Sequence, residues 1–261
     1  MSRRTIEGKR AVVTGASSGI GREMARELSR RGADIVVTAR REDRLRAMVD
    51  ELRAGGRKAE FVAGDIVQPE VREAVLDAAK SKLGGLDILV NNAGVGAAGP
   101  FAQASPERLR RIMEVNFFAP AELTRIAVPL LKSGNRPIVV NISSILGHRA
   151  VPNKSEYCAS KFALHGLSDA LRSELAHDGI DVLLVSPSTT ESEFFDSVLE
   201  RTAEPKWFGM KRMPAEAVAR KAVQAIMRGR HEIILTPFGR AVVWVDRLCP
   251  PLADRLVARF G

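Results

Sequence analysis

Seven short runs rich in β-branched and other apolar residues recur along the 261-residue chain, and stretches with helical spacing separate them. Strands that alternate with helices in this way form βαβ units, in which the strands are parallel and helices cover both faces of the sheet. The sequence therefore predicts an α/β fold, a doubly wound parallel sheet of about seven strands in a single domain that spans 1–261. The expected strands are 11–15, 33–40, 57–65, 86–94, 137–144, 180–188 and 231–235.

The glycine-rich stretch TGASSGIG, residues 14–21, follows the first expected strand and opens the first expected helix. Glycines at 15, 19 and 21 permit a tight turn, close approach of a ligand to the backbone, and close packing of helix on sheet. The free N–H groups at the start of that helix would face a pyrophosphate. In a long βαβ array this placement indicates a Rossmann-like sheet with a dinucleotide site.

The end of the second strand, VVTARRED, bears on the choice of cofactor. Ala39 stands where an acid would bind the ribose 2′-hydroxyl of NAD, and Arg40 and Arg41 follow it. A guanidinium binds phosphate in fork geometry, whereas an acid would repel it. We therefore predict that NADP(H) is preferred, with Arg40 as the ligand of the 2′-phosphate, and we leave NAD(H) open as an alternative.

The stretch SEYCASK contains the single tyrosine of the chain, Tyr157, four residues before Lys161. Residues at i and i+4 share one face of a helix. A nearby ammonium favours tyrosinate, so we expect Lys161 to lower the pKa of the phenol toward the working pH. Tyr157 could then give a proton to a carbonyl oxygen or take one from an alcohol. The alternative is a packed ring whose hydroxyl is satisfied.

These motifs, in this order, resemble those of the short-chain dehydrogenases/reductases over roughly residues 8–235. The resemblance is carried by TGASSGIG, GD at 64–65, NNAG at 91–94, Asn116 in MEVNFF, NISS at 141–144 and YCASK. It implies a catalytic set of Tyr157, Lys161, Ser144 and Asn116, with Ser143 as a less favoured neighbour of Ser144. It further implies that Ser144 holds the substrate oxygen, that Lys161 binds the nicotinamide ribose and that Asn116 positions a water.

The resemblance also implies cofactor contacts at the ends of several strands. Asp65 would accept from the adenine amino group, and Pro187 with the backbone near Thr190 would hold the carboxamide. Ser188 departs from the glycine, and Ser192 from the threonine, that the family usually has there. The full set of expected cofactor contacts is Thr14, Gly15, Ser17, Ser18, Gly19, Ile20, Gly21, Arg40, Asp65, Ile66, Asn92, Ala93, Gly94, Tyr157, Lys161, Pro187 and Thr190.

Two C-terminal segments bear on the substrate and on partners. Residues 189–213 form an expected cover over the substrate site, and its apolar side chains favour a medium-sized apolar ketone, aldehyde or secondary alcohol over a sugar. These side chains could equally anchor the cover to the domain or to a partner subunit. The tail, 237–261, carries an apolar stripe beside arginines, for which packing on the domain or a second subunit is favoured over an anionic membrane surface. The apolar residues are Phe194, Phe195, Trp207, Phe208, Met210 and Met213 in the cover, and Leu248, Leu252, Leu256 and Phe260 in the tail.

The remaining features limit the function classes. The net charge is +9, but only 5 % of residues are aromatic and no nucleic-acid-binding motif is present, so we expect no nucleic-acid partner. Cys158 and Cys249 lack paired spacing, and no signal peptide or membrane span is recognised, so we expect a cytoplasmic protein.

Three further expectations concern sites and partners. The histidines at 148, 165, 177 and 231 lack the spacing of metal ligands, so no metal site is expected. His148 and Arg149 follow Ser144 closely and are candidates for the wall of the substrate pocket. The family resemblance implies a homodimer or homotetramer. The alternative to an enzyme is a dinucleotide-binding sensor or scaffold of the same fold.

Overall fold

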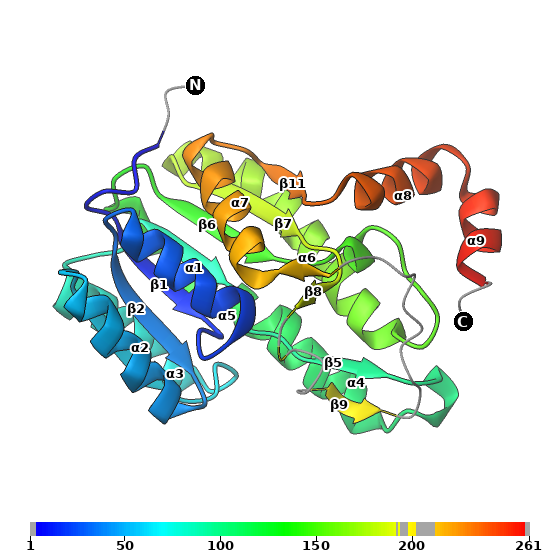
Figure 1. Ribbon diagram of the computed structural model, residues 1–261, viewed down its shortest axis with the longest axis horizontal. Helices are drawn as coiled ribbons and strands as arrows, with labels where there is room; N and C mark the ends of the chain where they lie inside the picture. The colour runs from blue at the N-terminus through cyan, green and yellow to red at the C-terminus, as the bar shows by residue number, and fades with distance from the viewer. Residues whose placement is uncertain (1–3, 192, 194–197, 202–211, 259–261) are drawn as a thin grey trace.

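Seven parallel strands form one sheet in the computed structural model, which describes residues 4–191, 193, 198–201 and 212–258 (Figure 1). The strands lie in the order β11, β7, β6, β4, β1, β2 and β3, and every neighbouring pair is parallel. This arrangement confirms the predicted Rossmann-like fold. The bounds are β1 (Arg10–Thr14), β2 (Asp34–Ala39), β3 (Ala59–Ala63), β4 (Ile88–Asn91), β6 (Ile138–Ile142), β7 (Asp181–Ser186) and β11 (Glu232–Ile234).

Helices cover both faces of the sheet because the strands are apolar on both sides. Val13 and Ile35 belong to one buried cluster, which α1, α2 and α7 complete, whereas Val12 and Val36 belong to a second cluster with α3 and α5. In Figure 1, α1 and α7 lie side by side over the near face. The helices are α1 (Gly19–Arg30), α2 (Glu42–Ala54), α3 (Pro69–Ala78), α4 (Pro106–Met113), α5 (Ala119–Lys132), α6 (Ser155–Glu174) and α7 (Ala215–Met227).

The order of the strands reverses direction at β1, whose two neighbours are β2 and β4. In doubly wound sheets, ligands bind outside the carboxyl ends of the strands at such a switch point. In the register of this sheet Val12 lies opposite Val36 on one side and Leu89 on the other. The glycine turn after β1 and the NNAG segment at the end of β4 are therefore neighbours at this edge.

Short strands outside the main sheet were not predicted. They pair as β5 (Gly96–Ala98) with β9 (Val198–Arg201) and as β8 (Thr190–Glu191) with β10 (Met213–Pro214). Strands of two to four residues are too short to show periodicity, and each pair joins segments that are distant in the chain. Met213 packs against the core, while the other apolar residues expected in the cover over the substrate site lie outside the described residues.

The C-terminal segment forms an arm of two helices, α8 (Pro237–Leu248) and α9 (Pro250–Ala258), which extends from the end of β11 (Figure 1). The break between the helices falls at Pro250, where the two prolines predicted an interruption. Arg149 holds the arm, because its guanidinium contacts Asp246 at 2.6 Å and Asp254 at 2.5 Å. The tail therefore packs on its own domain. Among the described residues, no helix is both long and apolar enough to cross a membrane.

Gly21 provides a direct test of the close packing at the switch point. A Cβ at this position would collide with the carbonyl oxygen of Gly15 and the side-chain amide of Asn92. We expect Gly21→Ala to lower the free energy of unfolding by about 1–3 kcal/mol, the usual cost of overpacking. Urea denaturation of the purified protein measures this change.

Gly166→Ala is the matched control, because Gly166 lies in α6 and its added Cβ would meet no atom within 4 Å. Alanine is favoured over glycine in a helix by roughly 0.5–1 kcal/mol, so this variant should be slightly more stable than the wild type. Equal effects of the two substitutions would contradict the packing argument.

Candidate active site

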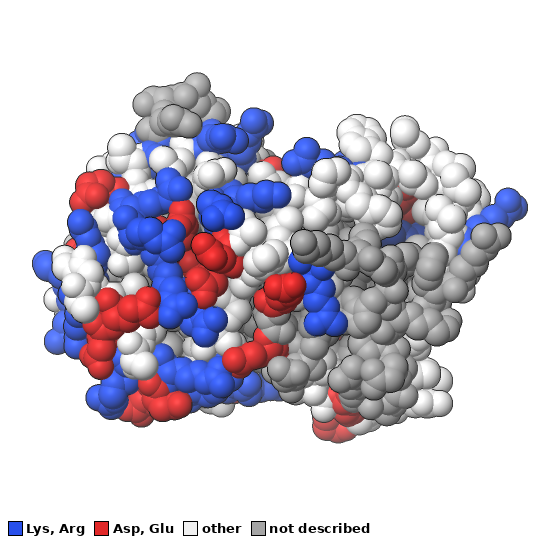
Figure 2. Space-filling model, viewed as in Figure 1, with Lys and Arg blue, Asp and Glu red and all other residues white. Residues whose placement is uncertain are grey.

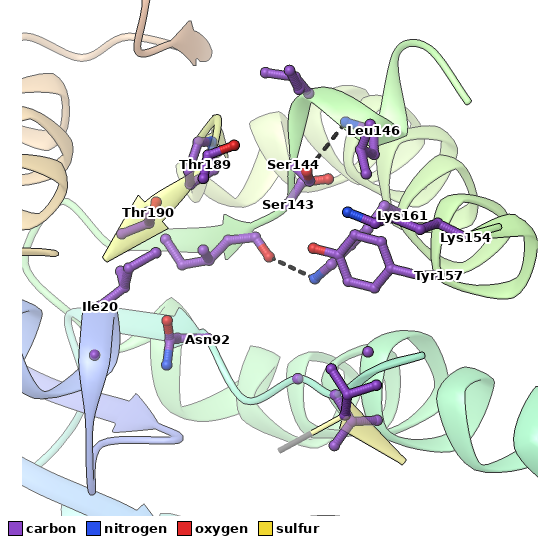
Figure 3. Close-up of a pocket in the computed structure, with 18 of the residues that line it drawn as sticks. Ile20, Asn92, Ser143, Ser144, Leu146, Lys154, Tyr157, Lys161, Thr189 and Thr190 are labelled. Carbon is purple, nitrogen blue, oxygen red and sulfur yellow. Dashed lines mark hydrogen bonds between the residues drawn. The ribbon is translucent and has the colours of Figure 1, made fainter. Parts of the chain in front are cut away.

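A cavity of about 1150 Å³ opens at the carboxyl ends of the strands, between the glycine turn, α6 and the C-terminal arm. Figure 3 shows Ser144, Tyr157 and Lys161 on one side of it, with Ile20 and Asn92 across from them. Most of the expected site residues line this one cavity: Gly15, Ser17, Ser18, Gly19, Ile20, Arg40, Asp65, Ile66, Asn92, Ala93, Gly94, Ser144, Tyr157, Lys161, Pro187 and Thr190.

Thr14, Gly21 and Asn116 were expected in the site but are not among the described residues that line the cavity. Thr14 is buried, and its Oγ1 accepts hydrogen bonds from the backbone N–H groups of Asn92 (2.9 Å) and Ala93 (3.0 Å). The Asn92 side chain returns a bond of 2.9 Å to the Thr14 carbonyl oxygen. Thr14 therefore ties the glycine turn to the end of β4, and its expected contact with the cofactor stays a prediction.

The start of α1 suits an anionic group. Ser18 is the N-cap residue, but its side chain makes no capping hydrogen bond, and the first turn of α1 contains no acidic residue. The N–H groups of this turn lack intrahelical partners and carry the positive end of the helix dipole. Because Gly19 and Ile20 line the cavity, these donors lie at its wall.

Arg40 and Arg41 follow β2, Arg44 lies in the first turn of α2, and Arg41 contacts the glycine turn directly. Its guanidinium bonds Ser17 Oγ at 3.0 and 3.1 Å and Ser18 Oγ at 2.8 Å. Arg41 and Arg44 also share the carboxylate of Glu193, at 2.8 and 2.7 Å, and these bonds lower the pKa of that carboxyl. Arg40 is exposed and lines the cavity, where its charge helps to lower the pKa of Asp65.

Asp65 lines the cavity, but its carboxylate already has protein partners. Arg111 forms an ion pair with one oxygen, and the backbone N–H of Val67 donates to the other at 3.2 Å. Burial acts to raise the pKa of Asp65, but these hydrogen bonds and the nearby arginine charges outweigh it and hold the pKa below its usual value. Asp65 therefore remains a carboxylate, which can only accept hydrogen bonds.

Tyr157 and Ser144 meet in the cavity, from α6 and from the end of β6. Burial raises the pKa of Tyr157 above its ordinary value and outweighs a hydrogen bond with Ser144, which acts to lower that pKa. The expected lowering of this pKa by Lys161 is thus wrong for this structure, and the phenol is protonated at neutral pH. Ser144, rather than Ser143, is the partner, whereas Ser143 Oγ is buried without a hydrogen-bond partner among the described residues.

Lys161 lies one helical turn after Tyr157, with its Nζ 5.7 Å from the centre of the phenol ring. The ammonium donates to the carbonyl oxygen of Ile142 at 3.0 Å. The side chain is buried, and desolvation lowers its pKa to about 8. Lys161 is therefore a cation at neutral pH that loses its proton in mildly alkaline solution.

Asn116 is buried in a π-helical turn, η3 (Glu114–Phe118), between α4 and α5. Its side-chain amide donates to the Val95 carbonyl oxygen and to Ser160 Oγ, both at 3.0 Å, and accepts from the Val95 N–H at 2.9 Å. Both N–H groups of the amide are thus used by the protein. In this arrangement Asn116 fixes the segment that follows NNAG against α6, and its expected role of positioning a water stays a prediction.

Ser188, which departs from the family pattern, has a defined partner. Its Oγ lies 2.6 Å from Thr236 Oγ1, and Thr236 caps α8 by accepting from the Gly239 N–H at 3.0 Å. The Pro187 carbonyl oxygen accepts from the N–H of Ile145 at 3.0 Å. The segment after β7 is therefore joined both to the loop that carries Ser144 and to the base of the arm.

The sequence of this chain is similar to those of known oxidoreductases. Residues 9–203 match the family model described as short chain dehydrogenase. The chain belongs to the short-chain dehydrogenase family. Among its relatives, a ketoacyl reductase of Nostoc is 31 % identical over 263 residues, which cover 98 % of this chain and 91 % of that protein. An uncharacterized oxidoreductase of Bacillus subtilis is 32 % identical over 255 residues, covering 95 % and 71 %.

Solved structures of the family have the same fold. A short-chain dehydrogenase/reductase from Burkholderia phymatum in complex with NAD matches with a TM-score of 0.86 and 27 % identity, covering 95 % of this chain and 96 % of that one. One from Burkholderia cenocepacia in complex with NADP gives 0.79 and 29 %, covering 88 % and 96 %. The family recognised from the sequence is therefore confirmed.

The C-terminal arm of this short-chain dehydrogenase forms one wall of the cavity, which the sequence analysis did not predict. Its inward side is apolar and lines the cavity, and Arg149, which was a candidate for the pocket wall, lies there with it. The amphipathic spacing of the tail was visible in the sequence, but the surface it covers was not. The lining residues of the arm are Phe238, Ala241, Val242, Val245, Ala253, Leu256 and Val257.

His148 is not among the described residues that line the cavity and instead contacts His165 and Glu232 behind it. Burial lowers the pKa of His165 to about 4, so this ring is neutral at pH 7.

Cys158 is buried, and burial raises the pKa of its thiol, which accords with the expected packing role.

The pKa of Lys161 predicts a dependence of stability on pH. Between pH values of about 8 and 10.5 the folded protein has released the Lys161 proton, while the unfolded chain still binds it. The free energy of unfolding contributed by this group therefore rises with pH across that window. Relative to Lys161→Met, the wild type should gain stability between pH 8 and 10.5 in urea denaturation. The half-exposed Lys132, replaced by Met, controls for the loss of one positive charge. Parallel curves for wild type and Lys161→Met would contradict the low pKa.

Proposed function

We propose that this chain is an NADP(H)-dependent oxidoreductase that transfers hydride between the nicotinamide and a ketone, an aldehyde or a secondary alcohol. Tyr157 is the general acid and base of the reaction. The observation that carries the proposal is the shared cavity, in which Ser144, Tyr157 and Lys161 face the uncapped start of α1. A relative named as a ketoacyl reductase and solved structures with NAD or NADP support the proposal.

The residues present fit a nicotinamide dinucleotide. The free N–H groups of Gly19 and Ile20 would bind the pyrophosphate, and Asp65 and Ile66 would lie at the adenine. Pro187 and Thr190 would hold the carboxamide, and Lys161 the adjoining ribose. When bound, the cofactor supplies or accepts the hydride.

Tyr157 is suited to donate a proton in carbonyl reduction because burial keeps its phenol neutral. Ser144, already bonded to the phenol, would donate to the same carbonyl oxygen and hold it near the phenolic proton. The Lys161 ammonium, 5.7 Å from the ring centre, would stabilise the tyrosinate left after transfer. In the opposite direction, the tyrosinate would take the proton of an alcohol.

The walls of the cavity favour an apolar substrate. Beyond Ser144 and Tyr157, the arm contributes Val242, Val245 and Leu256, and the facing loop contributes Leu146 and Val151. Apolar pockets with few polar groups bind apolar ligands and use the polar groups for orientation. The substrate class we propose is therefore a medium-sized apolar ketone, aldehyde or secondary alcohol.

The outer side of the arm suggests self-association. Trp244 is 60 % exposed and Leu248 77 % exposed, and this part of the molecule appears largely uncharged in Figure 2. Exposed apolar patches of this kind commonly mark interaction sites. We propose a homodimer or homotetramer that acts in the cytoplasm.

The cofactor preference is tested by variants at the end of β2. The wild type should have a higher kcat/KM with NADPH than with NADH, because Arg40 and Arg41 would bind the 2′-phosphate. Removing a hydrogen bond to a charged group costs about 1.5–3 kcal/mol, so Arg41→Ala should lower kcat/KM for NADPH by about 10- to 100-fold and change that for NADH little. Arg40→Asp should reverse the preference. Steady-state kinetics with both cofactors measures these effects.

Arg46→Ala is the matched control. Arg46 lies on α2, the helix that Arg41 precedes, but it pairs with Glu42 on the surface. Glu193→Gln provides a second test of the same assignment. The Glu193 carboxylate now holds Arg41 and Arg44, so its neutralisation should lower the KM for NADPH and leave that for NADH unchanged. Equal use of both cofactors by the wild type, or a preference for NADH, would refute the assignment.

The chemical role of Tyr157 is tested by Tyr157→Phe, which removes the phenolic hydroxyl and keeps the ring. General acid–base groups contribute about 10²–10⁴-fold, so kcat should fall by that factor while NADPH binding, measured by fluorescence titration, persists. The assay uses a panel of apolar ketones and of sugars, and the apolar ketones should be the faster substrates.

The two adjacent serines provide the matched pair for this experiment. Ser144→Ala removes the proposed donor to the substrate oxygen and should cost about 10²–10³-fold, the usual effect of losing such a donor. Ser143→Ala should remain close to wild type. Near-normal turnover by Tyr157→Phe would show that the assignment is wrong, and NADPH binding without turnover in the wild type would favour a sensor or scaffold.

A further inference from the structure

Behind the wall of the cavity, two histidines and a glutamate converge from three separate segments. We call His148, His165 and Glu232 the histidine–glutamate cluster. His148 follows the short 3₁₀ turn η4 (Ile145–Gly147), His165 lies on α6, and Glu232 begins β11. One potential ligand atom from each residue lies within 4.8 Å of those of the other two.

The distances within the cluster are close to those of a metal site. His148 Nε2 lies 3.1 Å from a carboxylate oxygen of Glu232. Two ligands that are each about 2.0–2.1 Å from a tetrahedral Zn²⁺ lie about 3.3 Å apart, so one ion could bridge this pair with little movement. Ser186 Oγ is also 3.1 Å from His148 Nε2 and offers a further oxygen.

An ion pair between His148 and Glu232 would not account for the state of His165. Its Nε2 is buried and has no hydrogen-bond partner among the described residues. The ring packs edge-on against His148, with centroids 4.3 Å apart. A Cβ at position 147 would lie 2.7 Å from this nitrogen, so the glycine there leaves room beside it. A buried nitrogen without a partner costs free energy unless a ligand satisfies it.

The cluster is also accessible and has a suitable donor set. The His148 side chain is only 4 % exposed, but Glu232 is 38 % exposed and connects the cluster to solvent. Two imidazoles and one carboxylate suit zinc and related first-row divalent metals better than they suit calcium or magnesium, which prefer oxygen ligands.

We propose that the histidine–glutamate cluster binds one divalent first-row transition metal ion through His148, His165 and Glu232. The bound ion ties the loop after Ser144 to α6 and to β11. Each histidine follows a residue of the candidate active site by four positions, His148 after Ser144 and His165 after Lys161, so the ion braces these residues from behind. A metal site was not expected from the sequence, because the three ligands lie far apart along the chain.

The test measures Zn²⁺ binding to the untagged full-length chain after chelator treatment, by competition with a chromophoric chelator and by elemental analysis. The wild type should bind one equivalent, and the ion should raise the midpoint of thermal unfolding. Loss of an outer-shell partner typically costs 10–100-fold in metal affinity, so His165→Asn and Glu232→Gln, which remove ligands, should each weaken binding at least about 10-fold.

Two control variants separate this site from adventitious binding. His177→Asn removes an exposed histidine elsewhere, and Cys249→Ser removes the exposed thiol. Both should bind Zn²⁺ as the wild type does, and the Co²⁺ form should show no thiolate charge-transfer band. The proposal is overturned if the wild type binds no Zn²⁺, if His165→Asn and Glu232→Gln bind it with unchanged affinity, or if Cys249→Ser abolishes binding. None of these results depends on turnover, so the proposed oxidoreductase activity stands or falls separately.

Discussion

The hydroxyl of Thr14 joins the ends of β1 and β4, the two strands that flank the switch point of the sheet. It accepts from the N–H groups of Asn92 and Ala93, which have just left β4, while the Asn92 amide bonds the carbonyl oxygens of Thr14 and Gly15. At the switch point of a doubly wound sheet these two strand ends must diverge to admit a ligand. The polar link at the base fixes how far apart they stand, and the glycine turn, α1 and the NNAG backbone all take their positions from it.

Burial determines the chemistry of the residues placed around that opening. Tyr157 keeps its proton because the cavity wall disfavours the phenolate, and the same desolvation brings the pKa of Lys161 down to about 8. The two pKa values move in opposite directions but have one cause, since burial favours the neutral form of both groups. The neutral Tyr157 phenol can donate a proton, and the neighbouring Lys161 ammonium can stabilise the tyrosinate until the proton returns.

The C-terminal arm is joined to the segments that carry the site residues. Arg149 follows Ser144 by five residues and clamps two aspartates of the arm, while Ser188 contacts the cap of α8. The loop that carries Ser144, the segment that follows β7 and the apolar wall of the cavity are thus joined by polar contacts. A change in the position of the arm would therefore alter both the shape of the pocket and the placement of Ser144.

Local periodicity explains how much of the fold could be predicted. Buried parallel strands and amphipathic helices leave their pattern within each segment, so all seven strands of the sheet were found. The i, i+4 spacing of Tyr157 and Lys161 could be read directly, whereas Ser144 was assigned from the family resemblance. Contacts across the chain left no such pattern. Arg41 meets Glu193 across 152 positions, and the histidine–glutamate cluster joins three distant segments. The predicted lowering of the Tyr157 pKa was wrong because the sequence shows the neighbouring lysine but not the burial of the phenol.

The most direct test of the central claim follows a single hydrogen. The protein is incubated with NADPH that carries deuterium at the transferable position of the nicotinamide, together with an apolar ketone, and the product alcohol is analysed by mass spectrometry. We expect the wild type to form an alcohol with one deuterium on the carbinol carbon, and Tyr157→Phe to form far less of this labelled product. An alcohol without deuterium, or equal labelling by the two proteins, would contradict this expectation.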